Sequence, residues 1–316
     1  MEQGIAHGGN LGEARRRFPT APEPWLDLST GINPFAYPLP GFPPEALTRL
    51  PEPDAVARLE ALLARRTGAL PEEVVAAPGT QILLPWIARL LPPGRARIPG
   101  PTYAEHARAA TLAGHALTDG PAEMLTLVNP NNPDGRLLAR AEVLSLARDH
   151  ALTVVDEAFM EAAPADESVA GQVGSGGLVV LRSFGKFHGL AGVRLGFAIA
   201  PAPLAARLRA SLGPWAVSGP ALFAGLAALG DEDWPAAMRR RLREEAAALD
   251  AVLAAGGCEV LGGTSLFRLA RVPDGTHDRL ARAGILTRRF AFWPDRLRFG
   301  LPPDAAARAR LAAALA

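Results

Sequence analysis

The segment Ser183–Gly196, with the sequence SFGKFHGLAGVRLG, contains Lys186, the only lysine of this 316-residue chain. Lys and Arg together number 33, so every other basic residue of these two types is an arginine. Arginine keeps its proton, whereas a lysine can lose its proton and form a Schiff base with a carbonyl. A lone lysine in a glycine-rich segment therefore indicates covalent chemistry. The alternative is a lysine without a function, retained by chance on the solvent-exposed surface.

The pattern of apolar runs around this segment predicts an α/β fold. Short Val- and Leu-rich runs are typical of strands buried in a parallel sheet. Such strands are expected at 74–77, 125–128, 152–155 and 178–181, with a shorter one at 95–98. Helical patterns alternate with them at 54–66, 80–91, 103–113 and 138–150. This alternation predicts a largely parallel sheet flanked by helices.

The pattern of predicted helices and strands changes after Gly230. A long helical pattern from Asp231 to about Ala255 precedes four short strands, at 259–261, 266–269, 285–287 and 296–299, and a final Ala-rich helix. The first 53 or so residues are rich in Gly and Pro, with a strand near 25–28. We therefore expect an amino-terminal arm (1–30) packing with the small domain, a large domain (31–230) and a smaller α+β carboxy-terminal domain (231–316).

The composition favours a globular enzyme over a nucleic-acid or membrane protein. Hydrophobic residues make up 49% and charged residues 21%, with a net charge of +1. No long basic run suggests nucleic-acid binding, and no run of about 18 apolar residues suggests a membrane span. The single Cys258 and the lack of a visible signal peptide favour a reducing, cytoplasmic location.

Polar clusters follow several of the predicted strands. Ligands of such sheets bind at the carboxyl ends of the strands. Gly79–Gln81 opens a helix, where free N–H groups suit a phosphate. The carboxylate of Asp156 ends a buried strand and needs a cationic partner; Asn129–Gly135 alone indicates a turn. With Lys186 and Arg194 after the next strand, the set predicts a site for an aldehyde cofactor that carries a phosphate and a ring nitrogen.

These motifs, in this order, resemble the fold-type I pyridoxal-phosphate enzymes of the aspartate-aminotransferase superfamily. The resemblance implies that Lys186 forms the Schiff base with pyridoxal 5′-phosphate, that Asp156 pairs with the pyridine nitrogen, and that Asn132 bonds the ring hydroxyl. Tyr103 would stack on the ring, the alternative being a core aromatic. The phosphate would be held by Gly79, Thr80, Gln81, Ser183 and Arg194.

The same resemblance extends to the substrate. Arg298 matches the arginine that binds the substrate α-carboxylate as a bidentate pair. Arg288 is a second candidate for this role, and an ordinary surface arginine is an equally good interpretation of it. Two positions depart from the pattern: Phe159 stands where a Tyr is common, and Gly185 where a Ser is common. Each departure implies one fewer hydroxyl near the cofactor.

The amino-terminal segments His7–Asn10 and Leu28–Pro34 are similar to the opening of the L-threonine-O-3-phosphate decarboxylases of cobalamin biosynthesis. The His-Gly-Gly turn offers the imidazole of His7 and backbone N–H groups to the substrate phosphate, with an inert His7 in the arm as the alternative. The resemblance implies that Asn33 lies near the substrate carboxylate, and that the products are CO₂ and (R)-1-amino-2-propanol O-2-phosphate. Histidinol-phosphate aminotransferase is the alternative, and a silent cofactor-binding module is a third possibility. The resemblance also implies a homodimer with a shared active site, to which Tyr37 is a candidate contributor.

Overall fold

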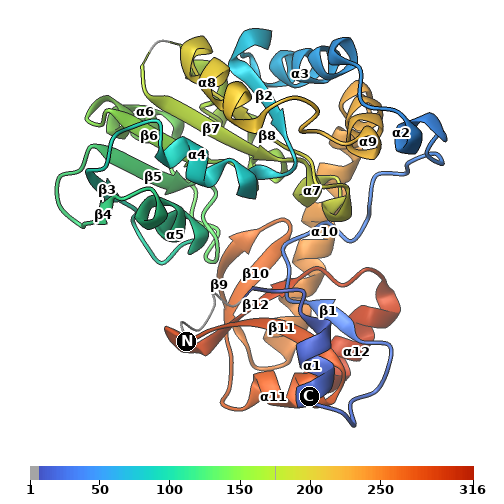
Figure 1. Ribbon diagram of the computed structural model, residues 1–316. Helices are drawn as coiled ribbons and strands as arrows, with labels where there is room; N and C mark the ends of the chain where they lie inside the picture. Colours follow the sequence, from blue (N-terminus) through green and yellow to red (C-terminus); the bar gives the residue numbers. More distant parts are fainter. Residues whose placement is uncertain (1–6, 175) are drawn as a thin grey trace. The chain divides into compact units, whose positions relative to one another are not determined.

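The computed structural model describes residues 7–174 and 176–316 (Figure 1). The chain divides into two compact units. One contains the described residues up to Phe35, together with Pro133–Arg136 and Ala236–Ala316. The other contains Ala36–Asn132 and Leu137–Pro235.

The second unit is built on a seven-stranded sheet. Its strands run in the order β2 (Val74–Ala77), β8 (Gly196–Ile199), β7 (Leu178–Ser183), β6 (Leu152–Asp156), β5 (Met124–Val128), β3 (Arg95–Arg97) and β4 (Ala116–Leu117). All neighbouring pairs are parallel except those of β8, which runs antiparallel to both β2 and β7. The predicted α/β class with a mostly parallel sheet is confirmed.

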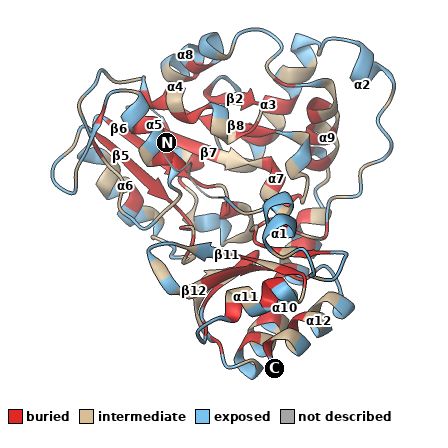
Figure 2. Cartoon of the chain, turned by 60° about the horizontal axis from the view of Figure 1, so that its bottom comes forward, coloured by how far each residue is buried: buried red, intermediate tan, exposed pale blue. Residues whose placement is uncertain are grey.

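Helices cover both faces of this sheet (Figure 1). One face packs against α3 (Pro53–Thr67), α6 (Arg140–Arg148) and α9 (Gly219–Gly230), and the other against α4 (Leu84–Ala88), α5 (Glu105–Leu112) and α8 (Ala202–Leu212). Among the central strands, β5, β6 and β8 are therefore buried throughout, and β7 is buried over its first four residues (Figure 2). Successive residues of β2 point into opposite cores, Val74 with α3 and Val75 with α4.

Several elements differ from the prediction. The sequence patterns did not indicate β4, β8, α8 or α9. The helix expected over 80–91 is instead a 3₁₀ turn, η2 (Thr80–Ile82), followed by α4. Pro85 lies in the first turn of α4, where the missing N–H costs little, and would disrupt a continuous helix. The last long helix, α10 (Trp234–Ala255), begins later than expected because the Asp231 carboxylate accepts the N–H groups of Asp233 and Trp234.

The first unit contains a five-stranded mixed sheet. Its order is β1 (Leu26–Leu28), β11 (Ile285–Phe290), β12 (Trp293–Gly300), β10 (Phe267–Arg271) and β9 (Glu259–Thr264). The helices are α1 (Leu11–Arg17), most of α10, α11 (Thr276–Arg282) and α12 (Ala305–Leu315). β1 pairs with β11 in parallel, so residues near the amino terminus complete a sheet of carboxy-terminal strands.

Two further short helices are α2 (Glu45–Thr48) and α7 (Phe184–Phe187), both in the second unit. Across residues 7–174 and 176–316, no helix combines the length and apolar composition that a bilayer crossing requires.

The two ends of α9 provide a test of its packing. A Cβ atom at Gly219 would lie 2.0 Å from the backbone oxygen of Ala46, beside α2. Gly219→Ala should therefore destabilise the protein by about 1–3 kcal/mol, because backbone would have to move. At Gly230, a Cβ would meet no described atom within 4 Å. Gly230→Ala should then be neutral or stabilise by up to about 1 kcal/mol. Urea unfolding midpoints check both; equal midpoints would contradict the packing.

Candidate active site

Several of the predicted cofactor residues lie at one edge of the seven-stranded sheet, the edge at which most of its parallel strands end. Because β8 is reversed, its first residue, Gly196, pairs with the last residue of β2, Ala77, and also with the last residue of β7, Ser183. Asp156, at the end of β6, pairs with Leu181 of β7. The carboxyl ends of β2, β6 and β7 therefore meet the amino end of β8 at this edge.

The turn after β2 lies against Arg194. Gly79 has a φ of 83°, and a Cβ there would lie 2.6 Å from an Nη atom of Arg194. A Cβ at Gly196 would similarly lie 2.6 Å from the backbone nitrogen of Thr80. Arg194 itself has a φ of 56° and donates to the carbonyl of Ala191 at 3.3 Å. The Arg194 guanidinium thus packs against the turn that opens η2, where neither Gly79 nor Gly196 leaves room for a side chain, and a guanidinium beside the start of a helical turn fits a phosphate.

Lys186 lies just beyond β7, in the short helix α7. Its neighbours Phe184 and Phe187 are buried, while Lys186 is partly buried. The Nζ atom lies 5.9 Å from the centroid of the Phe159 ring. Phe159, only 4% exposed, therefore places an apolar ring face beside the lysine, at the position where the resembling enzymes commonly carry a tyrosine.

The second departure, Gly185, has a steric cause. A Cβ at this position would lie 2.8 Å from the Cα of Ala191 and 3.3 Å from its nitrogen. The backbone of Ala191 therefore occupies the space that a serine would need.

Asp156 has a partner that the sequence reading missed. Its Oδ2 lies 2.8 Å from Nε2 of His106 on α5, and both residues are buried. Its Oδ1 accepts the N–H of Ala158 at 3.0 Å. This arrangement fixes the orientation of the carboxylate at the strand end. The available signal was a histidine in the first turn of a helix, and its pairing with a residue 50 positions away was not visible in the sequence.

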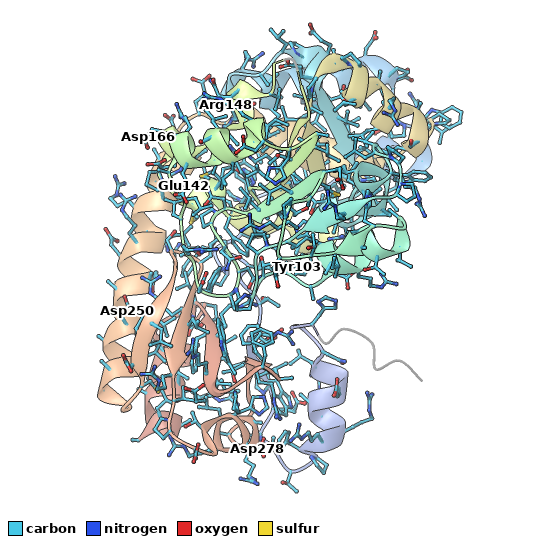
Figure 3. All side chains as sticks on the ribbon, turned by 90° about the vertical axis from the view of Figure 1, so that its left-hand side faces the viewer. Tyr103, Glu142, Arg148, Asp166, Asp250 and Asp278 are labelled. Atoms are coloured by element: carbon cyan, nitrogen blue, oxygen red, sulfur yellow. The ribbon has the colours of Figure 1, made fainter. Side chains whose placement is uncertain are left out.

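Tyr103, just before α5, belongs to the same cluster (Figure 3). Its ring meets the His106 ring edge to face, with the centroids 5.8 Å apart. Its hydroxyl donates to Oε1 of Gln81 at 3.1 Å, and Nε2 of Gln81 donates to Oε2 of Glu105 at 2.7 Å. The side chain of Gln81 thus binds these two neighbours.

The asparagine-rich turn after β5 is held by its own side chains. Asn129 exchanges two hydrogen bonds with the backbone of Leu138, at 2.8 and 3.1 Å. Asn131 accepts from the Thr102 hydroxyl at 2.6 Å and donates to Pro101. Asn132, partly buried, follows directly. The turn is therefore fixed next to the segment that carries Tyr103.

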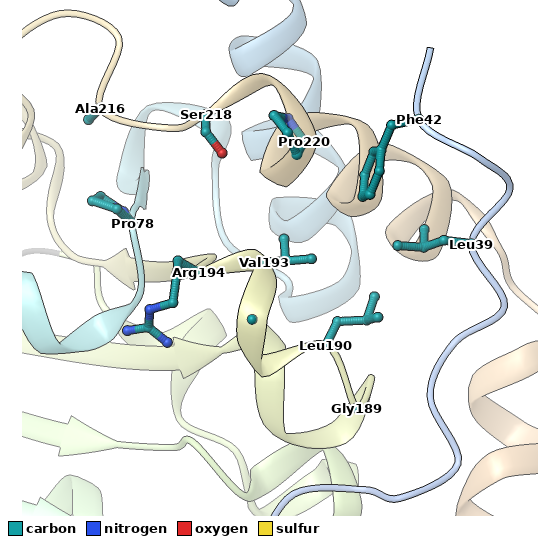
Figure 4. Close-up of a pocket in the computed structure, with 11 residues that line it drawn as sticks. Leu39, Phe42, Pro78, Gly189, Leu190, Val193, Arg194, Ala216, Ser218 and Pro220 are labelled. Atoms are coloured by element: carbon teal, nitrogen blue, oxygen red, sulfur yellow. The ribbon is translucent and has the colours of Figure 1, made fainter. Parts of the chain in front are cut away.

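A groove of about 710 Å³ borders Arg194 (Figure 4). Its walls are mainly apolar side chains: Leu39, Phe42, Leu190, Val193 and Pro220. Pro78 and Ser218 line it as well. The arginine therefore lies at the boundary between this groove and the turn after β2.

The first unit holds the predicted substrate arginines. Arg298 of β12 and Arg288 of β11 are opposite each other in the sheet. Arg298 is 7% exposed and donates to the carbonyl of Ser29 at 2.8 Å. Burial and the nearby charge of Arg288 lower the pKa of Arg298 to about 9, while Asp27 opposes the shift. Two guanidinium groups placed so close together under burial favour the binding of an anion.

The amino-terminal segment lies in the same neighbourhood. The N–H of Gly9 bonds the Ser29 hydroxyl at 2.7 Å, and a Cβ at Gly8 would lie 2.3 Å from the Ser29 oxygen. His7 is exposed and directly precedes these two glycines in the sequence. Asn33 is buried and accepts the N–H of Phe35 at 2.8 Å. The first unit thus gathers the predicted substrate residues, and the second unit the predicted cofactor residues.

Gly185→Ser tests the steric account of this departure. The added side chain should force the backbone apart at Ala191, lowering stability by about 1–3 kcal/mol and displacing the adjacent Lys186. Gly192→Ser is the matched control in the same segment, because a Cβ there approaches none of the described atoms within 4 Å. Thermal unfolding midpoints and the absorbance of added pyridoxal phosphate are the measurements. A stable Gly185→Ser protein with unchanged absorbance would refute the account.

Known proteins are similar to this chain in sequence and in fold. The chain is 46% identical to a threonine-phosphate decarboxylase from Sinorhizobium sp., over 100% of this chain and 99% of the relative. It is 44% identical to a threonine-phosphate decarboxylase from Pseudomonas aeruginosa, over 98% and 97% of the two chains. The solved histidinol-phosphate aminotransferase from Sinorhizobium meliloti, in complex with pyridoxal 5′-phosphate, has a similar fold, with a TM-score of 0.82 at 22% identity and coverage of 99% and 95%.

A family model described as aminotransferase class I and II matches residues 115–315, which include Lys186, Arg194 and Arg298. The relative from Sinorhizobium sp. covers the whole chain, including the amino-terminal segment that contacts Ser29. The chain belongs to the aminotransferase class I and II family.

Proposed function

We propose that this protein is a pyridoxal-phosphate-dependent decarboxylase that converts L-threonine O-3-phosphate into CO₂ and (R)-1-amino-2-propanol O-2-phosphate, a reaction of cobalamin biosynthesis. One observation carries the substrate: relatives named threonine-phosphate decarboxylase match nearly the full length of the chain, amino-terminal segment included. The residues at the sheet edge support the cofactor.

The second unit would hold the cofactor. Lys186 would bind its aldehyde carbon, Asp156 its ring nitrogen, Asn132 its ring hydroxyl and Tyr103 its ring face. Its phosphate would contact Gly79, Thr80, Gln81, Ser183 and Arg194. When bound, pyridoxal phosphate supplies an electron-withdrawing ring that can take up an electron pair released at the substrate α-carbon. His106 holds the Asp156 carboxylate in place, so the group that would pair with the ring nitrogen is oriented in advance.

The first unit would hold the substrate. Arg298, assisted by Arg288, would bind the α-carboxylate, and His7 with Asn33 would complete the pocket for the phosphorylated side chain. The orientation in which Arg298 holds the carboxylate decides whether CO₂ or the α-proton is lost. After the carboxylate leaves as CO₂, the Nζ atom of Lys186 would return a proton to the α-carbon.

The assembly is also a proposal. We propose a homodimer in which each active site is completed by the partner, with the arm (1–30), large domain (31–230) and small domain (231–316) as the units of each chain. Tyr37 remains the proposed contributor to the neighbouring site. Within its own chain, its hydroxyl lies 3.2 Å from Oδ2 of Asp231 and 3.3 Å from the Ala227 carbonyl.

A substrate comparison tests the reaction. The purified holoenzyme should release CO₂ from L-threonine O-3-phosphate without any requirement for 2-oxoglutarate. Histidinol-phosphate aminotransferase is the second candidate, since a relative of that fold binds the same cofactor. Formation of glutamate from histidinol phosphate and 2-oxoglutarate, with no CO₂ from threonine phosphate, would favour the aminotransferase.

Lys186→Ala tests the covalent role directly. Because the chain has no other lysine, the yellow absorbance of the lysine Schiff base should disappear, and decarboxylation should fall by about 10³-fold or more. Lys186→Ala combined with Arg148→Lys restores the lysine count at an exposed position on α6 and should not restore either signal. Absorbance that survives dialysis unchanged in Lys186→Ala would rule out the assignment.

A further inference from the structure

Glu105 is a buried glutamate beside the candidate cofactor site, and no role has been assigned to it. It lies in the first turn of α5, where an acidic residue suits the helix dipole, yet it is only 6% exposed. A solvated glutamate would serve the dipole equally well. Burying a carboxylate is costly unless it is paired. Its burial therefore indicates that its contacts matter.

The Glu105 carboxylate accepts hydrogen bonds from the side chains of Gln81 and Arg108. Nε2 of Gln81 donates to its Oε2 at 2.7 Å, and an Nη atom of Arg108 donates to the same oxygen at 3.3 Å. The Arg108 side chain is 59% exposed, so this ion pair is screened by solvent. The shorter bond to the Gln81 amide is therefore the defining contact. All three side chains line a groove of about 380 Å³ that also reaches Arg194.

The carboxylate decides the direction of the Gln81 amide. An ionised carboxylate only accepts hydrogen bonds, so the amide nitrogen must face Glu105. The amide oxygen then faces the Tyr103 hydroxyl, which donates to it at 3.1 Å. An amide turned the other way would bring two acceptors together at Glu105. The chain of hydrogen bonds from Glu105 to Tyr103 therefore has one favoured polarity.

The same chain restrains the Tyr103 ring. Its hydroxyl is held by Gln81, and its ring packs edge to face on His106, which binds Asp156. Burial, followed by the negative charges of Glu105 and Asp156, raises the pKa of Tyr103 to about 12, with Arg194 opposing. Tyr103 therefore stays neutral and keeps donating to Gln81 across the physiological pH range.

We propose that Glu105 is a positioning residue, which orients the Gln81 amide and thereby holds Tyr103 in the plane that stacks on the cofactor. The inference rests on the proposed function in taking Tyr103 as the stacking residue. The link from Glu105 to Tyr103 itself does not depend on any cofactor, and the two parts can be measured separately.

The first measurement follows the ionisation of Tyr103 in the full-length protein. The chain has two tyrosines, so a Tyr37→Phe background leaves Tyr103 as the sole phenol. An ultraviolet titration between about pH 9 and 11, where an ordinary tyrosine ionises, should detect almost no phenolate. Glu105→Ala and Glu105→Gln both remove a negative charge that raises the Tyr103 pKa, so phenolate should appear at lower pH in each.

The second measurement is the dissociation constant of pyridoxal phosphate. Glu105→Ala leaves the Gln81 amide without its acceptor, so the constant should rise about five- to thirtyfold. Glu105→Gln retains an oxygen that can accept from Nε2 of Gln81, so most of the affinity should be kept. The difference between the two variants separates the hydrogen bond from the charge.

Glu142→Ala is the matched control. Glu142 is also the first-turn acid of its helix, α6, but it is exposed and lies on a different helix from Glu105 (Figure 3). It should change neither measurement, although it removes the same helix-dipole partner.

The outcomes distinguish the possibilities. A lower unfolding midpoint in Glu105→Ala, with the Tyr103 titration and the cofactor affinity both equal to those of Glu142→Ala, would overturn the proposal. If the unmodified protein fails to bind pyridoxal phosphate at all, the proposed function fails. The Tyr103 titration would still report whether Glu105 controls this side chain.

Discussion

The reversal of one strand organises the candidate cofactor site. β8 runs antiparallel between β2 and β7, so its amino end, not its carboxyl end, lies at the edge where the other strands finish. The residues just before β8, Arg194 among them, are therefore brought against the turn that follows β2. A parallel β8 would carry Arg194 to the opposite edge of the sheet. The close contacts of Gly79 and Gly196 are the local consequence of this topology.

Much of the fold could be predicted because burial leaves a clear trace in the sequence. β2 coincides with the predicted strand 74–77, and β5, β6 and β7 lie within two residues of theirs, since each is a continuous apolar run. The direction of β8 could not be predicted, because it begins on a glycine and is set by partners far away in the chain. Pro85 was visible in the sequence, but its effect on the expected helix was overlooked.

The residues of the candidate site could also be predicted only where a local sequence pattern marks them. Lys186, Asp156 and Arg194 could be named from their places after predicted strands. His106 and Glu105 could not, because each acts through a residue far from it in sequence, Asp156 for the one and Gln81 for the other. The two departures from the family pattern also became understandable only in three dimensions: Phe159 lies beside Lys186, and the space beside Gly185 is filled by backbone.

The partly buried lysine of α7 has a practical consequence for labelling. Reagents that acylate or alkylate amines normally modify many surface positions, because most proteins display many lysines. The surface of this protein carries arginines instead, and its side chains offer a single primary amine. Ordinary amine chemistry at side chains therefore becomes a site-directed probe of this segment, and protection of that one amine reports directly on whether it is covalently engaged.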